Sequence, residues 1–269
     1  MSAGSDAAEP MWHEVAWRDE LLARIYVPPV ATRRAAAVID VHGGAWSSQD
    51  RTLGENYNLA LAASGCHVVA IDFRDGRVAR HPAASDDVIA AVDWVRSNGP
   101  TLGIDPGRVG LIGSSSGGHL ALYAALTGVE VPFVGAFWPP VDPFARARYA
   151  TTMLGKPVPQ GQRFDAVNLV RSTEAYFGTE AAMAEASIAE VVRNGRARHL
   201  PFLWLVRAGD DLNVPSALLD ELAATYRAVG GTVELTDYRD QKHGFGHGKG
   251  PIAQQFQADL VARVHAALA

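Results

Sequence analysis

The sequence predicts an α/β fold with a mostly parallel β-sheet and helices on both faces. Short apolar runs, such as residues 36–41 and 108–112, alternate with longer helical patterns, as is typical of parallel strands joined by helices. These runs are mostly apolar, which indicates strands buried on both sides. The 269 residues, 48% of them hydrophobic, are enough for one large core. We therefore expect residues 1–269 to form a single domain.

The expected elements follow in chain order. Residues 1–10 are rich in small residues and predict a loose terminus. Two β-like runs, 12–17 and 21–27, suit an antiparallel hairpin. Further strands are expected at 36–41, 67–73, 108–112, 133–138, 203–207 and 232–238, and helices at 53–63, 84–97, 118–126, 215–228 and 252–268. The prediction is thus a twisted sheet of about eight strands.

Residues 141–200 interrupt this alternation, because about sixty residues are far more than a connection between a strand and a helix needs. Two interpretations are open. The segment is either an insertion whose helical pieces, such as residues 181–193, form a small cap over the carboxyl ends of the strands, or an extended crossover with ordinary packing.

Composition and charge exclude several classes of function. The formal charge of -5 and isoelectric point near 6.0 argue against nucleic acid or anionic membranes as partners. Cys66 is the single cysteine, so no internal disulfide is expected and a buried thiol is the simplest interpretation. The start of the chain lacks the pattern of a secretion signal, and no run is long enough to span a bilayer. We expect a soluble, cytoplasmic protein.

A strand-to-helix turn presents a candidate nucleophile. Gly113-Ser114-Ser115-Ser116-Gly117 directly follows an apolar run at 109–112, and small residues are needed on both sides of such a turn. The glycines on both flanks favour Ser115. Ser116 is the alternative if Ser114 counts as the small residue.

A glycine-rich loop follows an earlier strand and is a candidate oxyanion site. In His42-Gly43-Gly44-Ala45-Trp46 the bare backbone leaves amide groups free to face a developing negative charge. A plain turn at the end of a strand is the alternative.

The candidate acid and base come later in the chain. Asp210 and Asp211 follow a predicted strand, although either aspartate could serve only to stabilise the turn. His243 follows the last predicted strand, and His247 lies further along the same loop as the weaker candidate. The chain order of serine, aspartate and histidine is the one that favours a nucleophilic serine with a general base.

Metal and phosphate chemistry are not expected. His243 and His247 have no third ligand at a recognisable spacing. The Gly117-Gly118 pair lacks the lysine of a phosphate-binding loop. We therefore predict that no cofactor and no metal is needed.

Taken together, these motifs resemble the α/β-hydrolases of the hormone-sensitive-lipase-like esterase group and its small bacterial relatives. The resemblance covers roughly residues 35–265 and weakens in the insertion. The stretches that carry it are 42–46, 72–74, 81–84, 87–95, 103–109 and 113–119. In many α/β-hydrolases the acid lies three residues before a Val-Pro pair, so the resemblance selects Asp211, ahead of Val214-Pro215.

The sequence also departs from that group. Aspartate and alanine usually flank its serine, whereas this chain has Ser114 and Ser116, and Ala45 stands where a third glycine is common. Because backbone amides stabilise the oxyanion, Ala45 still suits the role together with Gly43, Gly44 and Ser116.

The resemblance implies a serine hydrolase that cleaves carboxylic esters of short to medium acyl chains through an acyl-enzyme, with Trp46 contacting the substrate. His-Gly-Gly-x-Trp is also similar to the loop of kynurenine formamidases, so an amidase or arylformamidase is the alternative on the same residues. A ligand-binding protein without catalysis is the rival from another class. The natural substrate and the oligomeric state are not encoded in any motif.

Overall fold

The computed structural model describes residues 10–162 and 164–269. Within these ranges one sheet of eight strands has the order β1-β2-β4-β3-β5-β6-β7-β8. Strand β2 pairs antiparallel with β1 and with β4, whereas the pairs from β4 through β8 are parallel. The strands are β1 Met11–Arg18, β2 Leu21–Val27, β3 Ala37–Val41, β4 His67–Ile71, β5 Val109–Ser114, β6 Phe133–Phe137, β7 Phe202–Ala208 and β8 Val233–Tyr238. The predicted fold class is confirmed.

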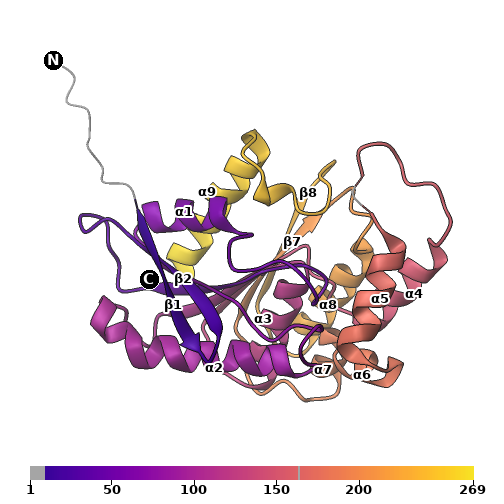
Figure 1. Cartoon of the computed structure of the whole chain (residues 1–269), viewed down its shortest axis with the longest axis horizontal. Coiled ribbons are helices and arrows are strands. Elements are labelled where there is room, and N and C mark those ends of the chain that lie inside the picture. The colour runs from indigo at the N-terminus through magenta and orange to yellow at the C-terminus, as the bar shows by residue number, and fades with distance from the viewer. Residues whose placement is uncertain (1–9, 163) are drawn as a thin grey trace.

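Helices cover both faces of the sheet (Figure 1). They are α1 Glu55–Ala63, α2 Ala83–Asn98, α3 Ser116–Thr127, α4 Pro143–Thr152, α5 Ala166–Phe177, α6 Glu180–Glu185, α7 Ile188–Arg193, α8 Ser216–Ala228 and α9 Pro251–Ala267, with short 3-10 turns at Gly99–Leu102 and Phe245–His247. Helices α1 and α9 pack on one face, whereas α2, α3, α7 and α8 pack on the other.

The central strands are apolar on both sides because each side meets a helical layer. Along β3, Ala37, Ile39 and Val41 point into one core and Val38 into the other. Successive side chains of a strand alternate between its faces, so a strand covered twice is apolar at most positions. This explains the nearly continuous apolar runs in the sequence. The exception in β3 is Asp40, which is buried and accepts hydrogen bonds from Tyr57 and Asn58.

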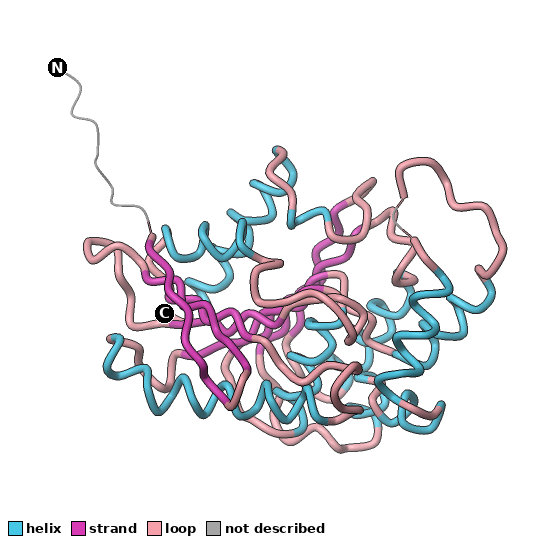
Figure 2. The backbone as a smooth tube through the Cα atoms, viewed as in Figure 1, coloured by secondary structure: helices cyan, strands magenta, loops and turns pink. Residues whose placement is uncertain are grey.

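The segment between β6 and β7 carries α4 to α7. Helices α4, α5 and α6 stand together at one end of the molecule (Figure 1), and residues 153–162 form a long loop between α4 and α5 (Figure 2). Helix α7 instead joins the core beside α3 and α8.

The sequence predicts a single helical piece over residues 181–193, but the structure has two helices there. The break follows from tertiary hydrogen bonds. The Ser187 hydroxyl donates to Asp142 Oδ2 at 3.0 Å, and the Ile188 amide donates to the Val141 carbonyl at 2.9 Å. These bonds hold the backbone of α7 against the start of α4 instead of continuing α6.

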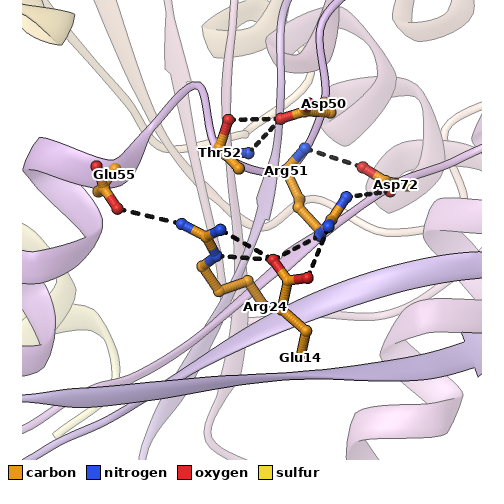
Figure 3. Close-up of polar contacts among 7 residues, drawn as sticks. All are labelled: Glu14, Arg24, Asp50, Arg51, Thr52, Glu55 and Asp72. Atoms are coloured by element: carbon orange, nitrogen blue, oxygen red, sulfur yellow. Dashed lines mark hydrogen bonds and ion pairs between the residues drawn. The ribbon is translucent and has the colours of Figure 1, made fainter.

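An ion-pair network fastens the antiparallel hairpin to the sheet (Figure 3). Glu14 of β1 accepts from Arg24 of β2 at 2.9 Å and from Arg51 at 2.7 Å. Arg51 also binds Asp72, which follows β4, at 2.8 Å, and Arg24 reaches Glu55 of α1 at 3.1 Å. Arg51 lies in the loop that runs from the His42-Gly43-Gly44 motif to α1, so the network anchors that loop.

Cys66 is fully buried before β4, as expected for a small apolar residue. Burial raises the pKa of its thiol to about 12. Along the described ranges, no helix has both the length and the apolar character needed to cross a bilayer.

Candidate active site

Ser115 sits between β5 and α3 in a strained backbone conformation. Its φ of 51° and ψ of -125° lie in a region that residues with a side chain rarely adopt, and such strain is tolerated where the surroundings enforce it. Here the Ser115 amide donates to the Phe137 carbonyl at 2.8 Å. A side chain on Gly117 would overlap the Val41 and His42 carbonyls, and one on Gly113 would overlap the Gly117 backbone. Both flanking glycines are therefore required by close approach.

The three consecutive serines differ in where their hydroxyls lie. Ser114 and Ser116 are fully buried, and neither hydroxyl has a hydrogen-bond partner within the described residues. Ser115 lines a cavity and its Oγ contacts a histidine. The geometry thus distinguishes Ser115 from its neighbours.

His243 connects Ser115 to Asp211. Its Nε2 lies 2.9 Å from Ser115 Oγ, and its Nδ1 lies 2.7 Å from Asp211 Oδ2. When Nδ1 carries the proton and donates to the carboxylate, Nε2 is left as an acceptor that faces the serine hydroxyl. Residues from three separate loops of the sheet thus form one hydrogen-bonded chain.

The two candidate aspartates have different surroundings. The Asp211 side chain is 4% exposed, and its Oδ1 accepts from the amides of Asn213 at 2.6 Å and Val214 at 3.2 Å. Asp210 is exposed and binds Gln162 at 2.9 Å. Asp211 is therefore held in place on both oxygens, whereas Asp210 makes no hydrogen bond to His243 among the described residues.

His247 takes no part in this chain. Its ring stacks on Tyr57, with centroids 5.9 Å apart, and no hydrogen bond links it to Ser115 or Asp211 among the described residues. Burial, reinforced by the charge of His243, lowers the pKa of His247 to about 4. It is a neutral packing residue at neutral pH.

The glycine-rich loop lies directly beside Ser115. A side chain on Gly43 would come within 3.1 Å of Ser115 Cβ. Gly44 and Ala45 have φ of 118° and 52°, and their amides form no hydrogen bond inside the part of the chain that the structure describes. Ser116 is the first residue of α3, and the first amides of a helix have no partner within it. Unpaired amides therefore come from both sides of Ser115.

These groups open into a cavity of about 670 Å³. The loops after β3, β5, β6, β7 and β8 contribute to its lining, together with α4, α5 and the loop between them. The carboxyl ends of parallel strands are where open α/β sheets place their sites. Within the described ranges no three His, Cys, Asp or Glu side chains gather as a metal site would require.

Comparison with known proteins agrees with this arrangement. The BD-FAE family model matches residues 23–137. Solved structures of esterase B from Lactobacillus rhamnosis and of an esterase from Pyrobaculum calidifontis superpose with TM-scores of 0.78 and 0.77 at 21% and 24% identity. They cover 96% and 97% of this chain and 87% and 88% of theirs. This chain has the α/β-hydrolase fold.

Sequence relatives narrow the placement within the α/β-hydrolases. The carboxylesterase NlhH of Mycobacterium tuberculosis is 35% identical over 103 residues, which are 38% of this chain and 32% of NlhH. An arylesterase of Saccharolobus solfataricus is 25% identical over 226 residues, 84% of this chain and 68% of the relative. In sequence the chain is thus similar to carboxylesterases and arylesterases. The match with NlhH spans about a third of that protein's length.

Trp46 does not line the cavity, although we expect from the sequence that it contacts the substrate. Its side chain is 1% exposed and is absent from the cavity lining. The indole stacks on Tyr176 and packs edge-on against His119 and Phe177. An aromatic residue behind a tight loop gains more by burial in the core than by facing water.

Several residues that line the cavity were not predicted from the sequence. They are Arg146 from α4, Asn168 and Leu169 from α5, and Lys242 beside His243. The first three come from the segment 141–200, where no motif or periodicity marks them. Lys242 adjoins the candidate base His243, so its neighbourhood is the available signal.

Proposed function

We propose that this α/β-hydrolase is a carboxylesterase that hydrolyses small esters through an acyl-enzyme. The observation that carries the proposal is the continuous hydrogen-bonded chain from Ser115 through His243 to Asp211. A serine hydroxyl becomes nucleophilic when a base removes its proton, and that base needs an orienting acid.

In the proposed mechanism Ser115 Oγ attacks the ester carbonyl while His243 Nε2 takes its proton. The negative charge that develops on the carbonyl oxygen is stabilised by the amides of Gly44, Ala45 and Ser116, with Gly43 shaping the loop. His243 then gives the proton to the leaving alcohol, and a water molecule activated by His243 releases the acid. Asp211 holds the imidazole with Nδ1 protonated throughout.

The names of related proteins support an ester substrate. A Thermogutta terrifontis esterase, a structural neighbour with a TM-score of 0.71, is phosphonylated by sarin, and another structure of that esterase has butyrate bound. An ethyl acetate hydrolase of Pseudomonas putida is 37% identical over 106 residues. We therefore propose short to medium acyl chains for this chain as well.

We further propose that residues 141–200 act as a cap that sets substrate preference. Helices α4 and α5 and residues Gly161 and Gln162 supply cavity lining opposite the strand ends. An extended crossover without a role in the site would have no reason to contribute polar side chains there.

Replacing Ser115 with alanine tests the mechanism. Hydrolysis of p-nitrophenyl butyrate should fall about 10⁴-fold or more, and a fluorophosphonate probe should no longer label the protein, while the circular dichroism spectrum stays unchanged. Ser114→Ala is the matched control, because Ser114 is buried away from the cavity, and it should keep labelling. Retention of wild-type turnover by Ser115→Ala would show that the nucleophile is wrongly assigned.

A second assay distinguishes amide hydrolysis from ester hydrolysis. The same enzyme is offered N-formylkynurenine beside short p-nitrophenyl esters. A higher kcat/KM for the formamide would replace the esterase proposal with an arylformamidase on the same residues.

A further inference from the structure

Arg146 places a buried positive charge at the cavity that holds Ser115 and His243. It belongs to α4 and is 2% exposed, and it lines the same cavity as those two residues. A charged side chain is seldom buried to this extent unless it is paired, because removing an ion from water costs several kcal/mol. The groups that contact the Arg146 guanidinium therefore indicate its role.

The described hydrogen-bond partners of this guanidinium are both neutral. Arg146 Nε donates to the Asn213 carbonyl at 3.3 Å and Nη1 donates to Thr173 Oγ1 at 2.9 Å. The Trp46 ring lies 5.6 Å from its Cζ. Along the described ranges, no carboxylate lies within 4.0 Å and Nη2 donates to no protein group. One edge of the guanidinium thus remains available.

Arg146 keeps its charge at neutral pH. Burial lowers its pKa to about 10, and the negative charge of Asp211 opposes that effect. The guanidinium therefore stays protonated throughout the range in which His243 acts as a base.

Lys242 gives the cavity a second positive group. Its Nζ donates to the Gly161 carbonyl at 3.0 Å, so this ammonium is also bound to a neutral acceptor. Among the described residues that line the cavity, none is an aspartate or glutamate. Arg146 and Lys242, the two charged side chains among the described lining residues, are therefore both positive.

We propose that Arg146 binds a carboxylate of the substrate, so that the preferred substrates are esters that carry a free carboxylate besides the bond to be cleaved. This rests on the esterase function proposed above. A carboxylate accepts two hydrogen bonds from one edge of a guanidinium, and binding it would give Arg146 a charged hydrogen-bond partner in addition to the neutral ones. Half-esters of dicarboxylic acids and esters of hydroxy acids share this chemistry.

Matched substrate pairs test the charge preference and find the side of the ester that carries it. p-Acetoxybenzoate against p-acetoxybenzamide places the carboxylate on the alcohol side. Mono-p-nitrophenyl glutarate against its primary amide places the carboxylate on the acyl side. We expect kcat/KM of the wild-type enzyme to favour the anion in at least one pair by about tenfold to a hundredfold, and rising salt to weaken that preference. Equal values in both pairs would overturn the proposal.

Substitutions then assign the preference to Arg146. Arg146→Met should reduce the anion-to-neutral ratio of kcat/KM by about tenfold or more, mainly through KM, and Arg146→Lys should restore part of it. Arg148→Met is the matched control, because Arg148 lies on the same helix but is exposed and outside this cavity. If Arg146 only holds the Asn213 carbonyl, and with it the Asp211 loop, its loss lowers both rates in proportion and leaves the ratio unchanged.

The outcomes separate this inference from the function on which it rests. Hydrolysis of neither substrate, without labelling by a fluorophosphonate, contradicts the esterase proposal. Hydrolysis of both without regard to charge contradicts the role of Arg146 alone. Should Arg146→Met fail to fold, the wild-type ratios and their salt dependence still decide the matter.

Discussion

Ser115 owes its position to its surroundings rather than to its own backbone preference. Its positive φ is held by the hydrogen bond to Phe137 and by the absence of side chains at Gly113 and Gly117. Strain of this kind costs about 1–3 kcal/mol. Buried neighbouring residues hold Ser115 in this strained conformation, so its hydroxyl is fixed before substrate binds.

The substitution Asp211→Asn tests the acid at this scale. An asparagine side chain would keep the shape but offer Nδ1 of His243 a donor or a neutral oxygen, so the tautomer that accepts the serine proton is lost. We expect kcat for p-nitrophenyl butyrate to fall about 10⁴-fold. Asp210→Asn, the adjacent exposed control, should keep kcat within about threefold, and a larger loss there would move the assignment to Asp210.

The position of a site residue could be predicted where the pattern of strands and loops determines it. It could not be predicted where tertiary packing determines it. Ser115, Asp211 and His243 each follow a predicted strand, so topology alone brought them to one edge of the sheet. Trp46 and Arg146 are placed by packing between a loop and the helices of the 141–200 segment, which no local pattern encodes.

At the scale of elements, the hairpin β1–β2 depends on polar anchors because most of β1 is exposed. Arg51 joins Glu14 on that hairpin to Asp72 after β4 (Figure 3). The Arg51 side chain is 15% exposed, and a network of several partly buried charges contributes more than isolated pairs at the surface.

Arg51→Met should lower the free energy of unfolding by about 1 kcal/mol in low salt, and by less in molar salt, where the wild-type pairs are screened. Urea denaturation at both ionic strengths measures this difference. Arg193→Met removes exposed pairs with Glu190 and Glu221 and should change the free energy of unfolding by less than about 0.5 kcal/mol. Equal effects of the two changes would contradict an anchoring role for Arg51.

The limits of helix prediction are also visible at this scale. Residues 181–193 contain good helix formers throughout, yet the chain breaks between α6 and α7. The bonds from Ser187 to Asp142 and from Ile188 to Val141 are long-range, so local propensity could not reveal them. The strands of the central sheet were predictable because burial on two faces leaves a nearly continuous apolar run.

At the scale of the whole molecule, buried neutral histidines make the stability of the folded state depend on pH. Burial lowers the pKa of His81 and His247 to about 4 and that of His119 to about 3. The unfolded chain takes up these protons near pH 6.5, so it binds more protons than the folded chain between about pH 6.5 and 4. The folded state is therefore favoured above that range and loses stability as the pH falls through it. Asp40 opposes this trend, because burial raises its pKa to about 7 and the folded state binds its proton first.

The substitution His119→Gln measures how much one of these histidines contributes to the pH dependence of stability. The glutamine amide can still donate to the Ala186 carbonyl that His119 Nε2 contacts at 2.9 Å, but it does not titrate. We expect the wild type to lose stability relative to His119→Gln as the pH falls from about 7 to 4.5, by more than about 1 kcal/mol. Urea midpoints at successive pH values measure the difference, and a constant gap would show that His119 is not kept neutral by the fold.

The thiol of Cys66, the single cysteine of the chain, can be used to detect unfolding. Because that sulfur is fully buried in the core and burial raises the pKa of the thiol, an alkylating reagent reaches it only after the surrounding core has opened. With one cysteine in the chain, each modified molecule gains a single mass increment. Mass spectrometry over time therefore counts opening events directly, and a variant that has lost turnover can be distinguished from one that has lost its fold.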